Sequence, residues 1–185
     1  MNRTDEVLVL AHRQGDKAAF DELVDRHAGS LFGYLVRMTG RRDQAEDLFQ
    51  ETFLRVHSRA DTFREGAAFK PWLFTIATRV AIDHRRGALR RLPTRSAETA
   101  PPAVSEAPGP PADAARSELK AQVRRAVDAL PDRQRAALVL SRFEGLSYPE
   151  VARIMDCSVG TVKTHVSRAL QALARRLPDP GGDEA

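Results

Sequence analysis

The 185-residue sequence contains one cysteine, Cys157, so the chain cannot form an internal disulfide bond. It also has no apolar run near the roughly 18 residues that a membrane-spanning helix needs. Its first residues, MNRTDEVLVLAHRQGD, carry charge on both sides of a short apolar stretch, unlike a signal peptide. We therefore expect a cytoplasmic protein with no membrane insertion.

Motifs of catalysis are missing as well. The sequence has no glycine-rich phosphate loop and no nucleophile motif, and its histidines His27, His57 and His84 stand apart from any metal-ligand spacing. Cys157 and His165 alone provide too few ligands for a metal ion. The sequence therefore predicts no enzymatic activity, no cofactor and no metal.

The charge is concentrated in the C-terminal third. The formal net charge is +4, and residues 116–177 carry 12 Lys and Arg against 6 Asp and Glu, whereas residues 1–86 carry 14 against 13. A basic segment of this kind is typical of a nucleic-acid-binding module. DNA or RNA is therefore the first partner to consider.

A proline-rich segment divides the chain. Six of the 11 prolines lie in residues 93–114, PTRSAETAPPAVSEAPGPPADA, which have no periodic apolar pattern. Such a composition cannot bury enough apolar surface to offset its ordering entropy. The prediction is an all-α protein whose two small helical domains, residues 1–92 and 116–178, are joined by a flexible Pro/Ala-rich linker, residues 93–115, and followed by a disordered acidic tail, residues 179–185.

Apolar residues at three- and four-residue steps predict the helices. In the first domain we expect helices at residues 17–38, 43–58 and 71–86, with Asp43 as the cap of the second helix and Pro71 in the first turn of the third. Trp72 is in phase with Leu73 and Ile76, which favours a core position over a base-stacking role. In the second domain we expect helices at residues 116–129, 132–143, 148–155 and 161–177.

Residues 146–170, LSYPEVARIMDCSVGTVKTHVSRAL, have the spacing of a helix-turn-helix. Ser147 and Glu150 form a capping-box pattern, residues 156–158 supply the turn, and Gly160 is expected to let the second helix begin close to the first. Val162 and Val166 should face the core. The candidate DNA-contacting residues of the motif are Ser158, Gly160, Thr161, Lys163, Thr164, His165, Ser167 and Arg168.

Three longer strings resemble one family. Residues 45–57, AEDLFQETFLRVH, and residues 69–86, FKPWLFTIATRVAIDHRR, resemble region 2 of the small extracytoplasmic-function sigma factors of bacterial RNA polymerase. Residues 130–170, LPDRQRAALVLSRFEGLSYPEVARIMDCSVGTVKTHVSRAL, resemble region 4 of the same family. The resemblance implies a promoter-specificity subunit that recognises the −10 and −35 elements.

The resemblance also implies roles for residues and partners. The partners would be core polymerase, through its largest and second-largest subunits, promoter DNA and an anti-sigma factor. The core-polymerase-binding surface would comprise Asp47, Gln50, Glu51, Phe53, Leu54 and Arg55. The −10 DNA-binding surface would comprise Phe63, Arg64, Phe69, Lys70, Arg79, Asp83, His84, Arg85 and Arg86, and the helix-turn-helix residues would read the −35 element.

Two other interpretations remain open from the sequence. A stand-alone LuxR-type regulator would suit the string SVGTVKTHVSRAL equally well, but it predicts an N-terminal sensory or receiver domain with βα alternation. An interaction protein such as an anti-sigma factor would not need the basic helix-turn-helix. The family often has Ser-Arg where this chain has Thr164–His165 and a cation where it has Leu170, so the −35 sequence is left open.

Overall fold

The computed structural model describes residues 3–91 and 111–177, and those residues form α-helices, one 3-10 turn and no strand. The first module, α1 to α4, also holds the 3-10 turn η1, and the second module is α5 to α8. The elements are α1 (Asp5–Arg13), α2 (Lys17–Thr39), α3 (Arg42–Ser58), η1 (Ala60–Thr62), α4 (Phe69–Arg91), α5 (Pro111–Asp128), α6 (Asp132–Arg142), α7 (Tyr148–Met155) and α8 (Val159–Ala174).

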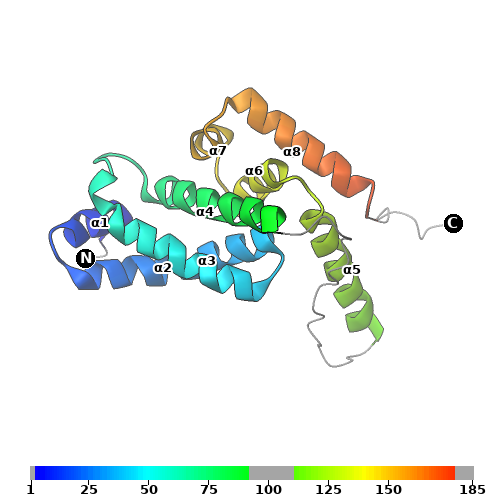
Figure 1. The fold of residues 1–185 in the computed structure, drawn as a ribbon, viewed down its shortest axis with the longest axis horizontal. Helices are drawn as coiled ribbons and strands as arrows, with labels where there is room; N and C mark the ends of the chain where they lie inside the picture. The colour runs from blue at the N-terminus through cyan, green and yellow to red at the C-terminus, as the bar shows by residue number, and fades with distance from the viewer. Residues whose placement is uncertain (1–2, 92–110, 178–185) are drawn as a thin grey trace.

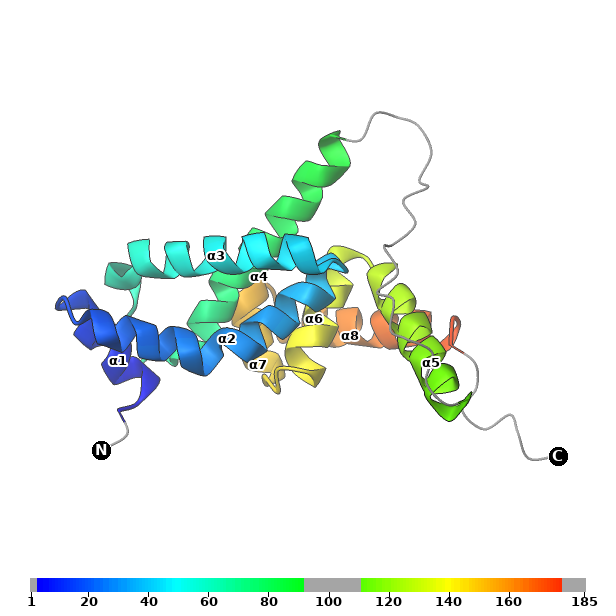
Figure 2. The same ribbon diagram turned by 90° about the horizontal axis from the view of Figure 1, so that it is seen from below.

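Helix α4 is the centre of the arrangement. It packs against α2 and α3 of its own module on one side and against α7 of the second module on the other (Figure 1). Seen from below, α2 and α3 run side by side, α6 and α7 lie at the end of α2, and α8 extends from them toward α5 (Figure 2). The two modules therefore share one continuous packed structure.

Helix α1 was not predicted from the sequence. Thr4 caps it by accepting a hydrogen bond from the backbone N–H of Val7, and Leu8 and Val9 are fully buried. Two acidic residues of its first turn attach it to the bundle: Asp5 lies 2.7 Å from Nε2 of His27, and Glu6 accepts from the backbone N–H of Phe69 at 3.1 Å. His27 is a buried polar residue that contacts the Asp5 carboxylate, so α1 is held by a polar contact as well as by apolar packing.

The helix boundaries differ from prediction at several helix ends, mostly N-terminal ones. The cap of α3 is Arg41 and not Asp43, whose carboxylate pairs with the Arg41 guanidinium at 2.6 Å. Helix α4 begins at Phe69, where Glu6 satisfies a backbone donor, so that Pro71 is its third residue. Helix α5 begins at Pro111, so residues 111–115 are helical, and α8 begins at Val159. The predicted linker up to residue 110 and the predicted tail lie outside the described residues.

The apolar face of the helix predicted at residues 17–38 is buried in α2. Leu23, Leu31 and Leu35 of α2 are fully buried, and buried Tyr34 shares a hydrogen bond of 2.8 Å with Thr78 of α4. Burial raises the pKa of Tyr34, so the phenol stays neutral and keeps this bond at physiological pH. Gly40 ends α2 in the left-handed conformation, with φ of 74°.

A substitution at Glu6 tests the attachment of α1. The hydrogen bond from the Phe69 N–H lowers the pKa of Glu6 in the folded protein. Ionised Glu6 therefore stabilises the fold above the unfolded-state pKa of about 4.3, and this stabilisation is lost as the pH falls through the lower folded-state pKa. Glu6→Gln should reduce the free energy of unfolding at pH 7 by about 1 kcal/mol, the usual value of a capping interaction. Urea unfolding at pH 7 and pH 3 measures this difference, which should shrink at pH 3, and exposed Glu65→Gln is the control.

Candidate functional site

The helix-turn-helix has the predicted geometry. The backbone N–H of Ser147 donates to the Glu150 carboxylate at 2.8 Å, which forms the capping box at the start of α7. Asp156 turns the chain in the left-handed region with φ of 50°. The Ser158 hydroxyl then caps α8 by accepting from the Thr161 N–H at 3.1 Å. These caps fix the angle at which α8 leaves α7.

Helix α8 has one buried and one exposed face. Val162, Val166 and Ala169 are buried, as predicted for the two valines. The candidate DNA-contacting positions lie on the other faces: Thr161 and His165 are half-buried, and the exposed ones are Ser158, Gly160, Lys163, Thr164, Ser167 and Arg168. Burial, followed by the charges of Arg133 and Arg168, lowers the pKa of His165, which favours the neutral ring.

The expected reason for Gly160 is wrong. A Cβ built at this position would meet only the Ser158 hydroxyl oxygen, at 3.6 Å, which is ordinary van der Waals contact. Helices α7 and α8 are therefore far enough apart at this position to accommodate an alanine. Gly160 lies on the exposed start of α8, where a small residue leaves the first-turn backbone N–H groups open.

The loop before α4 contains an aromatic cluster. Phe63 and Phe69 are 2% and 0% exposed, and both contact Trp72, with ring centroids 5.3 Å and 5.8 Å from the indole. This confirms the preferred packing role for Trp72, which lies half-buried against the core. In this conformation neither Phe63 nor Phe69 exposes its ring, so the two residues cannot make the predicted contacts with DNA. The two rings instead hold the loop against the helical bundle.

The charged residues and the histidine around α4 fall into two groups. Arg64, Arg79, Asp83 and Arg86 are exposed, and His84 is half-buried. Lys70 and Arg85 instead contact the second module: the Lys70 ammonium donates to the Glu144 carbonyl at 2.7 Å, and Arg85 pairs with Asp132 at 2.5 Å.

Helix α3 presents a mixed polar and apolar stripe. Asp47, Gln50 and Leu54 are exposed at a spacing that places them on one face, and Leu54 is 65% exposed. Glu51 and Arg55 neutralise each other in an ion pair of 2.6 Å. Phe53, predicted on this surface, is 6% exposed and contributes to the core beneath it.

An apolar groove adjoins this stripe and was missed by the sequence interpretation. It has a volume of about 650 Å³ and runs between α1, α2 and α3. The His12, Phe20 and His57 rings pack against one another within it in tilted and edge-on orientations, with the His12 ring centroid 4.6 Å from that of Phe20 and 4.9 Å from that of His57. Because α1 was not predicted, nothing in the sequence pattern placed His12 beside α3. The residues that line the groove are His12, Lys17, Phe20, Asp21, Phe49, Gln50, Phe53, Leu54 and His57.

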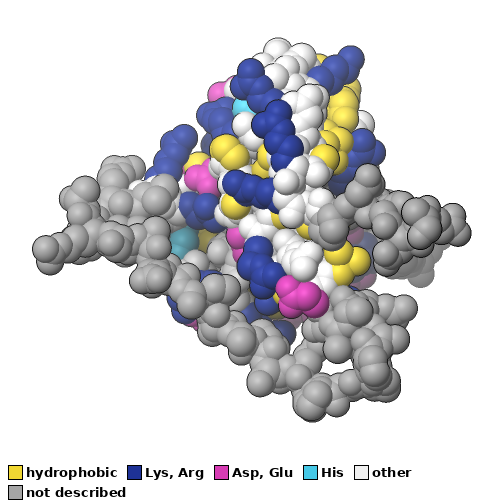
Figure 3. Space-filling view, turned by 90° about the vertical axis from the view of Figure 1, so that its right-hand side faces the viewer, with side chains coloured by type: hydrophobic (Ala, Val, Ile, Leu, Met, Phe, Trp, Pro, Cys, Tyr) yellow, Lys and Arg dark blue, Asp and Glu magenta, His cyan; other side chains and the backbone are white. Residues whose placement is uncertain are grey.

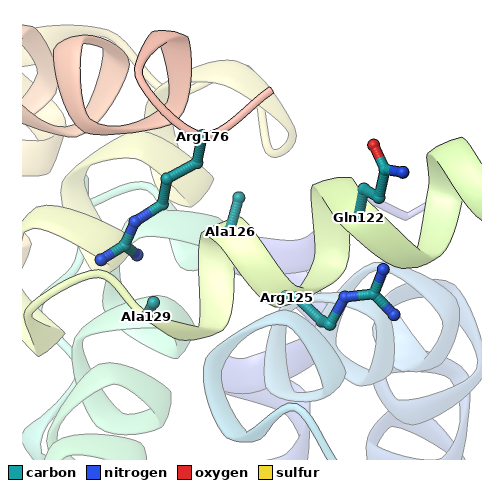
Figure 4. A pocket seen from close by; sticks show the side chains of 5 residues that line it. All are labelled: Gln122, Arg125, Ala126, Ala129 and Arg176. Carbon is teal, nitrogen blue, oxygen red and sulfur yellow. The ribbon is translucent and has the colours of Figure 1, made fainter. Parts of the chain in front are cut away.

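A second cleft lies at the far end of α8. Arg176 reaches over the small residues Ala126 and Ala129 of α5, and Gln122 and Arg125 complete the lining (Figure 4). Arg176 is fifteen positions beyond Thr161, or about 22 Å along a helix, so this cleft is separate from the candidate DNA-contacting surface.

The end of the molecule shown in Figure 3 carries many Lys and Arg side chains with few acidic ones among them.

No helix within residues 3–91 and 111–177 is long and apolar enough to cross a membrane. The same residues contain no group of three or more His, Cys, Asp and Glu that could hold a metal ion.

Comparison with known proteins identifies the family. A model of Sigma-70 region 2 matches residues 23–91, and a model of Sigma-70, region 4 matches residues 120–173. The RNA polymerase sigma-H factor of Pseudomonas aeruginosa is 36% identical over 180 residues, 94% of this chain and 93% of that protein. The ECF RNA polymerase sigma-E factor of Escherichia coli K12 is 33% identical over 181 residues, 94% of each chain.

Solved structures agree with this assignment. CnrH, in complex with the cytosolic domain of CnrY, has a TM-score of 0.70 at 27% identity and covers 92% of this chain and 95% of its own. The sigma factor RpoE, in complex with the anti-sigma factor NepR from Bartonella quintana, has a TM-score of 0.65 at 26% identity and covers 84% of this chain and 94% of its own.

Two helical modules with these matches define a sigma factor, which directs RNA polymerase to promoters in transcription initiation. The chain belongs to the extracytoplasmic-function sigma factors of the Sigma-70 family. The first module contains the region 2 match, so the LuxR-type alternative is not favoured.

The corrected role of Gly160 gives a stability prediction. Gly160→Ala should raise the free energy of unfolding by about 0.5–1 kcal/mol, because the added Cβ has room and alanine loses less backbone entropy in a helix. Gly40→Ala is the contrasting variant: it should cost about 1–2 kcal/mol from the left-handed backbone alone, and its Cβ would also lie 2.7 Å from Asp128. Urea unfolding measures the free energy of unfolding of both variants. A lower value for Gly160→Ala than for the wild type would contradict the space found around this position.

Proposed function

We propose that three surfaces divide the work of this sigma factor: α3 binds core polymerase, α4 and the loop before it bind the −10 element, and the start of α8 reads the −35 element. The observation that carries this proposal is the separation of the surfaces. Each lies on a different helix, and each is attached to the core through a buried face of that helix. The protein itself supplies binding and positioning, without a catalytic group.

The start of α8 has the chemistry of a major-groove reader. Lys163 and Arg168 can reach base edges or phosphates, and the hydroxyls of Thr161, Thr164 and Ser167 can hold phosphates. The N-terminal end of a recognition helix is the part that enters the groove. Neutral His165 would contribute a ring nitrogen and not a charge, because its pKa is lowered.

The α4 surface suits an opened −10 element. Arg79 and Arg86 are exposed and can hold the phosphate backbone of a displaced strand, while exposed Arg64 lies on the loop before the helix. Unstacking a base costs a few kcal/mol, which contacts to the extruded base must offset. The buried rings of Phe63 and Phe69 would support such a pocket from below.

The α3 stripe and its groove suit a helical partner on core polymerase. Exposed Leu54 supplies an apolar anchor, and Asp47 and Gln50 supply polar contacts around it. We assign this surface to the largest subunit, and the second-largest subunit is a further proposed contact. The complex would act in the cytoplasm, and an anti-sigma factor would hold the free protein inactive, as the complexes of CnrH and RpoE suggest.

The polymerase surface is tested by Asp47→Arg combined with Gln50→Ala. Losing two central contacts and adding a repulsive charge should weaken binding to core polymerase on the order of 100-fold. Size-exclusion chromatography and a titration with labelled protein measure this, and Asp25→Arg, a charge reversal at an exposed position of α2, is the control. Unchanged binding by the double variant would remove α3 from the proposal.

The −35 surface is tested in the holoenzyme with Lys163→Ala and Arg168→Ala. Both variants should form holoenzyme normally, yet each should bind promoter fragments more weakly. A lost phosphate contact should lower the salt-dependence slope by about 1, whereas a lost base contact should cost about 1–3 kcal/mol and relax sequence preference. Gel-shift assays across salt concentrations separate the two roles. Arg142→Ala, at an exposed position of α6, is the control and should leave affinity and slope unchanged.

A further inference from the structure

Val159, the first residue of α8, is an apolar side chain that the fold does not use. It is 37% exposed, whereas Val151 of α7 and Val162 and Val166 of α8 are between 0% and 2% exposed. It belongs neither to the buried core nor to the half-buried apolar residues that pack against that core. A single exposed apolar residue is ordinary on a protein surface. Val159 differs by its place, because the first turn of a recognition helix is the part that enters the major groove.

Val159 also does nothing for the start of the helix. The first turn of a helix favours polar or acidic side chains, which satisfy free N–H groups or interact with the positive end of the helix dipole. Here the Ser158 hydroxyl has the capping role: it accepts from the Thr161 N–H at 3.1 Å and shares a hydrogen bond of 2.9 Å with the Thr161 hydroxyl. A helical valine has one strongly preferred χ1 rotamer, so its two methyl groups project in a fixed direction.

The residues around Val159 allow this short side chain to reach a base. With about 100° of rotation per residue, Gly160, Thr164 and Ser167 form an exposed row opposite the buried face of α8. Val159 and Lys163 lie one turn apart on one flank of that row. Because Gly160 has no side chain and the other two members of the row are small, the helix backbone can approach the groove floor closely. A valine on the flank then comes within reach of the base edges.

We propose that Val159 contacts the 5-methyl group of a thymine in the −35 element and is a specificity-determining residue beside the polar ones. The thymine methyl is the apolar group that a base pair presents in the major groove, and the other base edges present hydrogen-bonding groups there. Contact between the methyl groups of the valine and the thymine removes apolar surface of both from water, which favours thymine at that position. This inference rests on the proposed function of α8.

Lys163 restricts where that thymine lies. It is four residues beyond Val159 on the same flank, about 6 Å along the helix, and the base pairs of a duplex are about 3.4 Å apart. A lysine contacts guanine at O6 and N7. A guanine that Lys163 contacts should therefore lie within about two base pairs of the thymine, on either strand.

The other exposed apolar residue of α8 provides a matched control. Leu170 is 42% exposed and lies on the same flank as Val159, but it is eleven residues, or about 16 Å, further along the helix. It is therefore outside the end of the helix that enters the groove. Leu170→Ala removes apolar surface from the same side of the same helix without changing the proposed contact.

The test uses holoenzyme assembled from the full chain and core polymerase. The preferred −35 sequence is first selected from promoter duplexes that are randomised in that element. Each thymine of either strand is then replaced in turn by deoxyuridine, which lacks only the 5-methyl group. For the wild type, replacing one particular thymine should weaken binding about threefold to fivefold, the change that corresponds to the burial of one methyl group.

Val159→Ala should abolish this sensitivity to the methyl group. Its holoenzyme should bind the thymine duplex about as weakly as the wild type binds the deoxyuridine duplex, and the replacement should not weaken its binding further. Leu170→Ala should keep both the affinity and the sensitivity of the wild type. Urea unfolding of the free proteins establishes that both variants are folded, as expected for substitutions at exposed positions.

Three results would overturn the proposed contact. One is a wild-type holoenzyme that selects a −35 sequence but loses no affinity at any deoxyuridine. Another is a Val159→Ala holoenzyme that keeps the wild-type sensitivity, and the third is equal loss of sensitivity in Leu170→Ala. A wild-type holoenzyme that selects no −35 sequence at all would instead show that the proposed function of α8 is wrong, and the thymine contact with it.

Discussion

The arrangement of the two modules depends on the last turn of α2. The final carbonyls of a helix lack partners within it and must be satisfied from elsewhere. Here Gly40 turns the chain away, and the Met38 carbonyl receives one guanidinium from α4 and one from α6. A single backbone group thus joins the helix that ends the first module to the helix at the centre of the second. Because these donors are charged, they attach more strongly than neutral ones.

The distribution of charge follows the division of tasks. The first module is nearly neutral overall, and two of its proposed −10 cations, Lys70 and Arg85, contact the second module, whereas Lys163 and Arg168 of α8 are exposed. Non-specific attraction to DNA grows with the number of phosphates neutralised. The first module alone should therefore bind DNA weakly, and promoter binding should require polymerase to hold both modules in place. This is the behaviour expected of a subunit that acts only within the holoenzyme.

Periodicity and capping signals predicted the helices after residue 16, the helix-turn-helix and the inward faces, because those features depend on residues three or four apart. Helix α1 was missed, since its apolar stretch is short and its anchors, Asp5 and Glu6, bond to residues far along the chain. The family resemblance supplied candidate residues but not their exposure, so the burial of Phe63 and Phe69 was unforeseen. The contacts between the two modules could not be predicted at all: Ser30 and Glu144 are 114 positions apart, and Arg135 is 97 beyond Met38.

Arg85 cannot bind its present partners and the proposed DNA phosphate at once, because one guanidinium cannot satisfy two sets of acceptors. In this structure its partners are the Met38 carbonyl, through a hydrogen bond, and the Asp132 carboxylate, through an ion pair. A DNA phosphate would offer oxygen acceptors of the same kind. Separating the modules would also expose apolar surface to water, because one hydrophobic cluster extends through both of them. The contact between the modules therefore combines polar attachments with apolar packing.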